Sequence, residues 1–341
     1  MFFLRRLFAH GLCTAALALA STRADAQPFR LPTANAAIFE PGNEEKFFVG
    51  TTGKPWRSGT YGCVRSEGWQ FHEGLDIRCV TRDKNKEPAD AVTATADGIV
   101  AYTNKRSGLS NYGNYLVIMH EIEGLEIFSL YAHLKEIRPG LQYGTRVKAG
   151  DVVALMGRTS NTREQISRER AHLHFELNLF VSDRFPDWYK KFLPTQRNDH
   201  GSYNGLNLLG LDPQAILLEQ RAKGKNFSLV KFIQKQPELC RVFVRQAELP
   251  WVKRYAPLIT RNPVAEREGV LGYEMSLNFA GIPCRIVPRA ASEISSRARI
   301  QLLSVNEPEQ TRHPCRKLVT KRSGKWEFTN HGTEHIELLM F

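Results

Sequence analysis

The sequence predicts a mainly β protein, with an antiparallel β-sheet or barrel-like domain over residues 48–213 and a small β-rich accessory domain over residues 214–341. Between residues 48 and 213, short apolar runs alternate with turns rich in Gly, Asn and Asp, which is typical of many short strands. A chain of 341 residues is long enough to bury two hydrophobic cores.

The N-terminus resembles a secretory signal. Arg5 and Arg6 precede a mostly apolar segment, residues 7–20, that is too short and too interrupted to span a membrane. The small residues at 24 and 26 fit a cleavage site. We therefore expect residues 1–26 to be a signal peptide and the mature protein to be exported, to the periplasm or the extracellular space. An N-terminal anchor that is not cleaved is the alternative.

The next elements follow from local composition. Residues 27–47 are rich in Pro, Ala and Asn, so we expect an N-terminal arm that leads into the first domain. Four apolar runs rich in β-branched and aromatic residues are then expected to be strands. These runs are residues 99–102, 115–119, 127–131 and 152–156.

Two motifs carry the residue types and the spacing of a metal site. Apolar and polar residues alternate over residues 172–177, so a strand there would place His172, His174 and Glu176 on one face. About a hundred residues upstream, His72 stands four positions before Asp76. Imidazoles and carboxylates that converge in this way suggest zinc.

A further histidine, His133, lies between these motifs and is flanked by apolar residues, as expected where a strand ends beside a cleft. A catalytic zinc usually has three protein ligands and one open position. His72, Asp76 and one histidine of the pair would supply two nitrogens and one oxygen, and the other histidine could handle protons. His-x-His alone is weak evidence, because buried histidines with satisfied hydrogen bonds give the same pattern.

Six segments together make the pattern more specific. They are residues 71–77, 94–100, 112–118, 131–134, 147–153 and 172–176. In order and in flanking residues, they resemble the lysostaphin-type zinc metallopeptidases, the peptidoglycan endopeptidase family, which has a duplicated-hybrid-motif β fold. The resemblance runs over residues 48–213.

The resemblance implies a role for each site residue. His72, Asp76 and His174 would bind one Zn²⁺ per chain, and His133 and His172 would be the catalytic histidines. Every position needed for activity is filled. The expected protein is therefore a zinc-dependent metalloendopeptidase, a hydrolase that acts on peptidoglycan peptides.

Two segments depart from the family or extend it. Residues 157–171 are longer than the usual Gly/Ser/Thr-rich turn and carry four arginines, at positions 158, 163, 168 and 170. This loop should border the substrate groove, and it is either a specificity loop or a solvated loop. Residues 178–211 form an aromatic-rich insertion, which is either a flap packed on the domain or a wall of the groove.

The accessory domain belongs to no family that we recognise. Residues 214–236 are expected to form two helical pieces broken near Gly224. Strands are expected at residues 241–244, 273–279, 300–305 and 336–341.

Charge is distributed unevenly along the chain, whose formal net charge is +12. Residues 27–213 hold 23 basic and 22 acidic residues, whereas residues 214–341 hold 21 basic and 12 acidic residues. A basic accessory domain suggests an anionic cell-wall polymer as a partner, and a solvated basic surface without a partner is the alternative. We find no nucleic-acid-binding motif.

Five cysteines follow the predicted cleavage site, at positions 63, 79, 240, 284 and 315. Export permits disulfides. Cys63 and Cys79 bracket the first motif, so we expect a bond between them that would brace the strand carrying His72 and Asp76. Cysteine as a zinc ligand is a weaker interpretation, because no Cys-x-x-Cys spacing occurs.

Three functional hypotheses remain open. The first is the peptidoglycan endopeptidase. The second is a catalytically silent cell-wall-binding protein or an activator of a separate amidase, and the third is a metallopeptidase that acts on proteins. The N-terminal arm has no histidine or cysteine for the metal, and we do not expect Asn35 or Asn43 to reach it.

Overall fold

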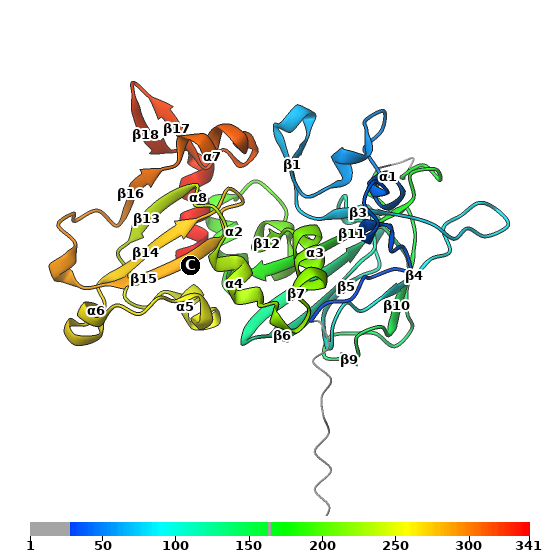
Figure 1. Cartoon of the computed structure of the whole chain (residues 1–341), viewed down its shortest axis with the longest axis horizontal. Coiled ribbons are helices and arrows are strands. Elements are labelled where there is room, and N and C mark those ends of the chain that lie inside the picture. The colour runs from blue at the N-terminus through cyan, green and yellow to red at the C-terminus, as the bar shows by residue number, and fades with distance from the viewer. Residues whose placement is uncertain (1–27, 163–164) are drawn as a thin grey trace, which may run out of the picture.

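The structure, a computed structural model, describes residues 28–162 and 165–341, and the predicted signal peptide lies outside this part. Two β-rich parts lie side by side, one built around strand β11 and the other around strand β14 (Figure 1). Every ladder between named strands is antiparallel. The predicted mainly β, antiparallel fold is confirmed, and the strands of the described part form open sheets rather than a closed barrel.

The largest sheet has the order β12-β11-β7-β6-β5-β9, and β3 also pairs with β11. Its strands are β3 (Leu75–Arg78), β5 (Gly98–Asn104), β6 (Tyr115–Ile122), β7 (Leu125–Ala132), β9 (Arg146–Val147), β11 (His172–Phe180) and β12 (Leu208–Leu211). The first three runs predicted as strands lie in β5, β6 and β7. A two-residue turn joins β6 to β7, and both of its residues, Glu123 and Gly124, have the positive φ that a tight hairpin needs.

Smaller sheets flank this one. The order β4-β10-β8 joins β4 (Ala91–Thr93), β10 (Val152–Met156) and β8 (Leu134–Ile137), so the fourth predicted strand is also confirmed. A hairpin of β1 (Gly62–Arg65) and β2 (Gln70–His72) stands beside the end of β3 and carries His72 at its end.

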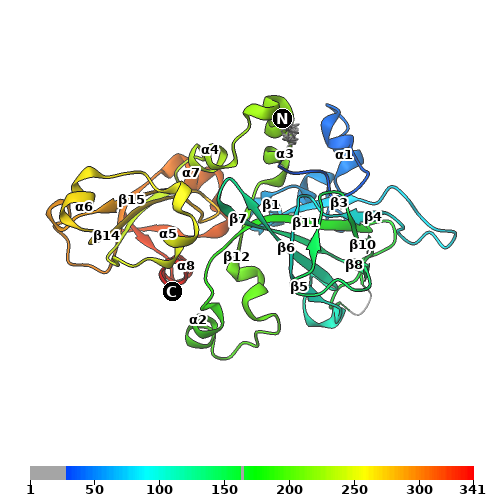
Figure 2. The same cartoon turned by 90° about the horizontal axis from the view of Figure 1, so that it is seen from below.

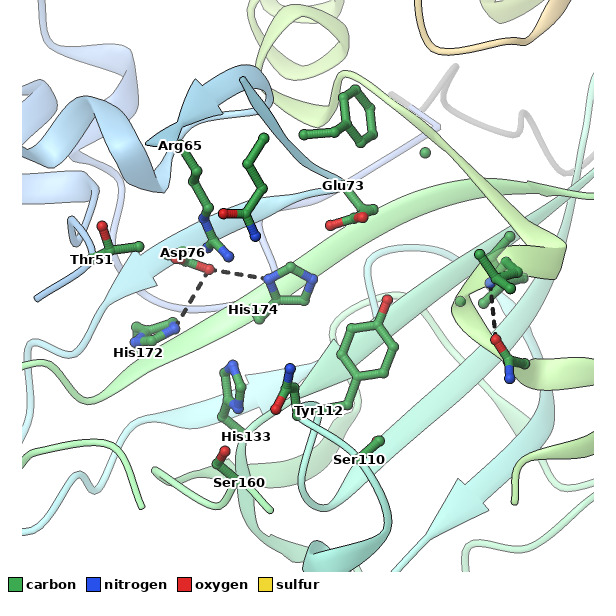
Figure 3. Close-up of a pocket in the computed structure, with 18 of the residues that line it drawn as sticks. Thr51, Arg65, Glu73, Asp76, Ser110, Tyr112, His133, Ser160, His172 and His174 are labelled. Carbon is green, nitrogen blue, oxygen red and sulfur yellow. Dashed lines mark hydrogen bonds and ion pairs between the residues drawn. The ribbon is translucent and has the colours of Figure 1, made fainter. Parts of the chain in front are cut away.

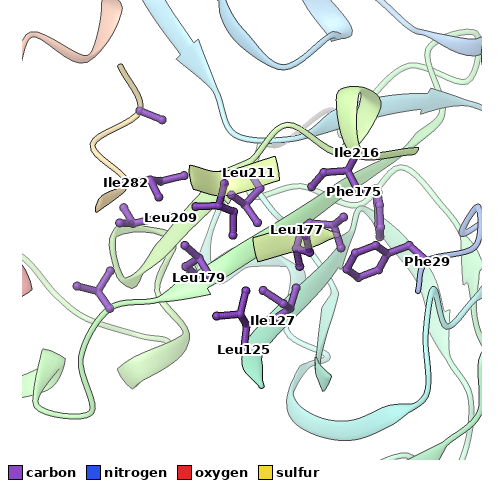
Figure 4. Close-up of a cluster of buried hydrophobic side chains, with 14 of the residues drawn as sticks. Phe29, Leu125, Ile127, Phe175, Leu177, Leu179, Leu209, Leu211, Ile216 and Ile282 are labelled. Carbon is purple, nitrogen blue, oxygen red and sulfur yellow. The ribbon is translucent and has the colours of Figure 1, made fainter. Parts of the chain in front are cut away.

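The two faces of β11 differ as the alternation predicts. Leu173, Phe175, Leu177 and Leu179 are buried in the hydrophobic core, whereas the residues between them, from His172 to Phe180, face the other side. Figure 4 shows that this core also takes in side chains from β7, β12 and α3, and from the accessory domain. Buried apolar residues of both parts of the chain therefore form one continuous cluster.

Residues 28–47 pack against the first domain and include α1 (Glu44–Phe47). Phe29 is only 1% exposed, and its backbone N–H and C=O both bond the side-chain amide of Gln220. The side-chain amide of Asn35 donates to the carbonyl oxygens of Lys46 and Arg78. Neither Asn35 nor Asn43 lines the groove that contains His133, His172 and His174, in agreement with the expectation that neither reaches the metal site.

The predicted helical pieces are α3 (Pro213–Lys223) and α4 (Leu229–Gln234). The helix breaks at Gly224, whose φ of 53° other residues rarely adopt. The carboxylate of Glu123, in the β6–β7 turn, accepts hydrogen bonds from the first residues of α4 and so ties the helical segment to the main sheet. The aromatic insertion contains α2 (Phe185–Phe192).

The accessory domain contains an antiparallel sheet of order β15-β14-β13-β16 (Figure 1), which Figure 2 shows from below, and a separate hairpin, β17–β18. These strands are β13 (Cys240–Val244), β14 (Gly272–Leu277), β15 (Pro283–Arg289), β16 (Ile300–Val305), β17 (Val319–Arg322) and β18 (Lys325–Phe328). Its helices are α5 (Pro250–Arg254), α6 (Pro263–Glu268), α7 (Glu307–Arg312) and α8 (Asn330–Met340). Three of the four strands predicted in this domain coincide with β13, β14 and β16.

The fourth of these predictions is wrong, because residues 336–341 lie in helix α8 and its C-cap rather than in a strand. The hydroxyl oxygen of Thr329 accepts a hydrogen bond from the backbone of Gly332 and caps the helix N-terminus. Buried residues then recur at helical spacing, at Gly332, His335, Ile336 and Leu339. A short apolar run cannot be assigned to helix or strand by periodicity alone.

The predicted disulfide between Cys63 and Cys79 is also wrong. Cys63 is bonded to Cys315, 252 residues away, so the bond joins hairpin β1–β2 to the accessory domain. The Cys79 thiol is buried and donates to Asp90 Oδ2 over 2.8 Å. Burial and this carboxylate raise the pKa of Cys79 to about 12, so it is a structural thiol. Cys240 and Cys284 are buried and unbonded as well.

Short 3-10 helices connect many of these elements. They are η1 (Ala37–Phe39), η2 (Trp56–Gly59), η3 (Ser66–Gly68), η4 (Ser107–Leu109), η5 (Gly201–Tyr203), η6 (Gly205–Asn207), η7 (Gly224–Asn226), η8 (Ala256–Leu258), η9 (Ala291–Glu293) and η10 (Pro314–Arg316). Across residues 28–162 and 165–341, no helix has the length and apolar character needed to cross a bilayer.

Candidate metal centre

The five predicted site residues converge at one end of the main sheet, and Figure 3 shows four of them, Asp76, His133, His172 and His174. The register of β11 against β3 places His174 opposite Asp76, and its register against β7 places His174 opposite Ala132, the residue before His133. Strand β2 ends at His72. The site residues, which are separated by up to 102 positions in the chain, therefore meet because four strand ends lie together.

Three of these side chains have the geometry of zinc ligands. The Nε2 atom of His72 lies 3.1 Å from Nδ1 of His174 and 3.2 Å from Oδ1 of Asp76, and His174 Nδ1 lies 3.1 Å from the same oxygen. Ligands about 2.0–2.1 Å from a tetrahedral zinc are roughly 3.3 Å apart. These three residues form the one His/Cys/Asp/Glu group of suitable geometry found in the described part of the chain.

The outer hydrogen bonds of the histidines leave lone pairs at the centre. The Nδ1 atom of His72 lies 2.7 Å from the carbonyl oxygen of Thr60, and Nε2 of His174 lies 2.7 Å from Oε1 of Glu176. Both outer nitrogens must donate, because both partners only accept. In the neutral tautomers, two nitrogen lone pairs and a carboxylate oxygen thus point at one another, an arrangement that a cation stabilises.

Without a metal, a proton takes this central position. Burial opposes a charge on His174, but its hydrogen bonds with Asp76 and Glu176 outweigh burial and raise its pKa to about 9. Burial alone would raise the pKa of Asp76, but the surrounding His72, His172 and His174 hold it well below its usual range. The site is therefore built for positive charge.

His133 and His172 point into the same site without joining the three ligand atoms. Nδ1 of His133 lies 2.8 Å from the carbonyl oxygen of Thr159, and Nδ1 of His172 lies 2.6 Å from that of Arg170. Both Nδ1 atoms therefore donate, which leaves each Nε2 as an acceptor. Burial lowers the pKa of both histidines, so they are neutral at pH 7 and can accept a proton.

Glu176 was predicted to share a face with the histidines, but the sequence did not reveal its role. It accepts a hydrogen bond from His174, from the hydroxyl of Tyr112 at 2.8 Å and from the side chain of Asn178 at 2.9 Å. Its pKa is lowered because these hydrogen bonds outweigh burial, so it is a carboxylate. Glu176 thus fixes the tautomer and the orientation of His174.

Replacing Glu176 with glutamine is expected to weaken zinc binding by about 10- to 100-fold, the usual effect of losing a carboxylate that orients a metal-bound histidine. Competition with a chromophoric chelator measures this affinity. Glu73→Gln is the matched control, because Glu73 lines the same groove without a hydrogen bond to any ligand residue. Equal zinc affinity of the Glu176→Gln and wild-type proteins would show that Glu176 does not position His174.

Arg65 is a second contact that the sequence did not reveal. Its Nη2 atom lies 2.6 Å from Oδ2 of Asp76, the carboxylate oxygen that faces away from the histidines. Its Nε donates to the carbonyl oxygen of Ser58. Because Arg65 occupies the outer oxygen, Asp76 is held with a single oxygen toward the centre.

A groove with a volume of about 560 Å³ opens over the centre. Its wall includes polar and basic residues together with segments of the insertion and the accessory domain. Lining residues include Thr51, Arg65, Glu73, Ser110, Tyr112, His133, Ser160, Ile166, Arg170, His172, His174, His200, Leu206, Gly210, Ala280 and Arg316.

The arginine-rich loop, residues 157–171, is held to the domain by ion pairs and hydrogen bonds, and part of it lines the groove. Arg158 and Arg168 both pair with Glu87, at 2.9 and 2.7 Å, and hydrogen bonds from these two arginines lower the pKa of Glu87 to about 2. Arg170 lines the groove and donates to the carbonyl oxygen of Gly50. Arg163 lies outside the described residues. The loop is thus anchored by Glu87, and only Arg170 among its described arginines faces the groove.

Both interpretations of the aromatic insertion hold, each for a different part of it. Phe185, Trp188 and Tyr189 of α2 are buried, as expected of a packed flap. His200 and Leu206, further along, line the groove. The insertion is therefore a flap whose second half forms a wall of the groove.

Comparisons with known proteins found one family model and several solved structures that are similar to part of this chain. Residues 70–184 match the model of peptidase family M23. No curated protein matches the chain. Similar solved structures include a zinc-containing peptidase from Vibrio cholerae, with 27% identity over 39% of this chain and 30% of that chain, and a TM-score of 0.23. The matched part of this chain thus spans under a third of the Vibrio protein's length.

Two further similar structures are peptidases by description. One is the catalytic domain of the antimicrobial peptidase lysostaphin from Staphylococcus simulans, with 19% identity over 47% of this chain and 87% of that chain, and a TM-score of 0.28. The other is a candidate glycyl-glycine endopeptidase LytM from Ruminococcus gnavus, with 24% identity over 42% and 55%, and a TM-score of 0.26. The family match covers His72, Asp76, His133, His172 and His174, and residues 70–184 of this chain form a peptidase family M23 domain.

Proposed function

We propose that this chain is an exported zinc metalloendopeptidase that hydrolyses peptide bonds of peptidoglycan. The observation that carries the proposal is the meeting of three lone pairs, from His72, Asp76 and His174, beside two neutral histidines in an open groove. A protein that only binds the cell wall has no need of such a centre, so these residues favour an enzyme over the silent regulator.

The proposed chemistry divides the work between the residues. His72, Asp76 and His174 would hold the zinc, which lowers the pKa of bound water and polarises a carbonyl group when present. The free Nε2 atom of His133 or His172 would accept the proton of the attacking water, and the imidazolium formed in this way could then donate a hydrogen bond to the developing oxyanion. One of them would then return the proton to the leaving amine. The backbone acceptors of both imidazoles keep each Nε2 directed at the site.

Separate features support the peptidase activity, the export and the cell-wall partner of this proposal. The M23 family match supports a peptidase, and the predicted signal peptide supports export. The disulfide between Cys63 and Cys315 is of a kind that persists in oxidising compartments. The proposed anionic cell-wall partner of the accessory domain depends on its excess of basic over acidic residues, 21 against 12.

The test combines zinc content with release of soluble muropeptides from purified peptidoglycan, for the mature protein and for His72→Ala. We expect one zinc per chain and release by the wild type alone. Zinc without release would indicate the cell-wall-binding regulator, and no zinc would contradict the metal centre itself. Cleavage of casein but not of peptidoglycan would indicate the protein-directed peptidase.

A further inference from the structure

The accessory domain supplies part of the groove wall. Ala280 and Arg316 line the same groove as His133, His172 and His174, although they lie more than a hundred residues beyond the last histidine motif. Both belong to segments that lie against hairpin β1–β2: Ala280 follows β14, and Arg316 ends η10. The groove is therefore incomplete without the accessory domain.

This wall is fixed in place. Cys315, the residue before Arg316, is bonded to Cys63 of β1, two residues before Arg65. Beside it, the ring of Phe279 stacks on His313 at 4.1 Å and contacts Tyr61 and Phe71 edge-on. A covalent bond and an aromatic cluster thus hold η10 against the hairpin that carries His72.

Arg316 differs from the other arginines of the groove. Arg65 is paired with Asp76, and Arg170 bonds the carbonyl oxygen of Gly50 and the hydroxyl of Thr52. In contrast, Arg316 has no hydrogen bond or ion pair with any residue of the described chain, and its Nε is buried without a partner. Its guanidinium lies 5.1 Å from the centre of the Phe71 ring.

A buried Nε without an acceptor is unfavourable, because buried polar groups nearly always find hydrogen-bond partners. Burial lowers the pKa of Arg316, yet an arginine remains a cation at neutral pH. Its planar fork is shaped for two parallel hydrogen bonds to a carboxylate. Its guanidinium contacts the ring of Phe71 and interacts electrostatically with Glu73, and these two residues flank His72, so such a carboxylate would lie next to the metal centre.

We propose that Arg316 of the accessory domain binds a carboxylate of the peptide substrate and thereby selects acidic peptides for the groove. The inference rests on the proposed function for its substrate class and assigns the accessory domain a direct role in specificity. Glu73 attracts Arg316 electrostatically but forms no ion pair with it within 4 Å, so the guanidinium donors stay available to the substrate.

The test measures binding rather than cleavage, so that it can be read separately from the proposed activity. The probes are N-acetylated muropeptides with free carboxylates, and the same muropeptides with the carboxylates converted to carboxamides. Acetylation removes their amines, so Glu73 has no ammonium group to bind. Calorimetry is performed on the zinc-loaded full chain carrying His133→Asn, alone and combined with Arg316→Gln, Arg316→Lys, Glu73→Gln or Lys317→Gln.

We expect the free acids to bind about 10- to 100-fold more tightly than the carboxamides, the usual range for hydrogen bonds to a charged group. Arg316→Gln should abolish this preference, and Arg316→Lys should keep part of it. Lys317→Gln should leave it unchanged, because Lys317 is the exposed neighbour outside the groove. Glu73→Gln should preserve or strengthen it, because a nearby negative charge is removed.

Equal affinity for both probes, or a preference that survives Arg316→Gln, would overturn the proposal, as would the absence of binding to either probe. Zinc content and thermal melting of each variant show that the centre and the fold are retained. If Arg316→Gln does not fold, the lysine variant still decides, since it keeps the charge but loses the fork. A wild type that binds acids selectively but cleaves nothing would refute the proposed function alone.

Discussion

Replacing His174 with alanine is expected to remove zinc from the protein and to reduce muropeptide release to background. In the proposed centre His174 would supply one of three ligand atoms, and the two remaining ligands would be too few for a structural or catalytic zinc site. The change also leaves the buried carboxylates of Asp76 and Glu176 without the imidazole that joins them. Zinc content after dialysis and peptide release from purified peptidoglycan measure the two effects.

The control for this variant is His331→Ala, which makes the same substitution at an exposed histidine of the accessory domain. It should keep one zinc per chain and wild-type release. Circular dichroism establishes that both proteins are folded. A folded His174→Ala protein that retains zinc or releases peptides at the wild-type rate would show that the centre has another ligand set.

The raised pKa of His174 leads to a prediction of how zinc affinity depends on pH. In the metal-free protein the pKa of His174 is raised to about 9, so a proton occupies the centre at neutral pH and zinc must displace it. Below pH 9 the apparent zinc affinity should therefore rise about tenfold per pH unit, because one proton is released for each zinc bound. Calorimetry in buffers of different ionisation enthalpy counts that proton.

Strand alternation predicted only part of the centre, and the full set of His72, Asp76, His133, His172 and His174 followed from the resemblance to a known family. The alternation through residues 172–177 is sufficient to place His172 and His174 on one face, and the structure confirms it. The acceptors that orient the imidazoles could not be predicted in this way. Thr60 and Thr159 offer backbone carbonyl oxygens, which leave no trace in side-chain identity.

The sequence also could not predict contacts between residues that are far apart in the chain. Cys63 has four possible partners, and its bond to Cys315 depends on how the accessory domain packs. The same packing brings Arg316 into the groove. The sequence around Arg316 does not distinguish it from Arg312 or Lys317. The boundaries of the domains and the signal peptide stay predictions.

Replacing His133 is expected to reduce kcat by about 10²- to 10⁴-fold while zinc remains bound, because a positioned proton-transfer group contributes this much. His133 lies near the centre without being one of its three ligand atoms, as its ring centre is 5.9 Å from that of His174. Its backbone has a φ of 61°, a conformation that asparagine tolerates better than alanine. His133→Asn therefore removes the proton acceptor with the least disturbance of the turn.

The measurement separates chemistry from binding. Steady-state kinetics of His133→Asn should show a fall in kcat with little change in KM, and metal analysis should show one zinc per chain. His172→Asn should lose activity as well, but its Nε2 lies 3.5 Å from Asp76 Oδ1, so a small loss of zinc affinity is expected there and not in His133→Asn. If the kcat of His133→Asn falls less than tenfold, or falls only in proportion to lost zinc, His133 is a structural neighbour of the centre. Proton transfer would then have to pass through His172 alone.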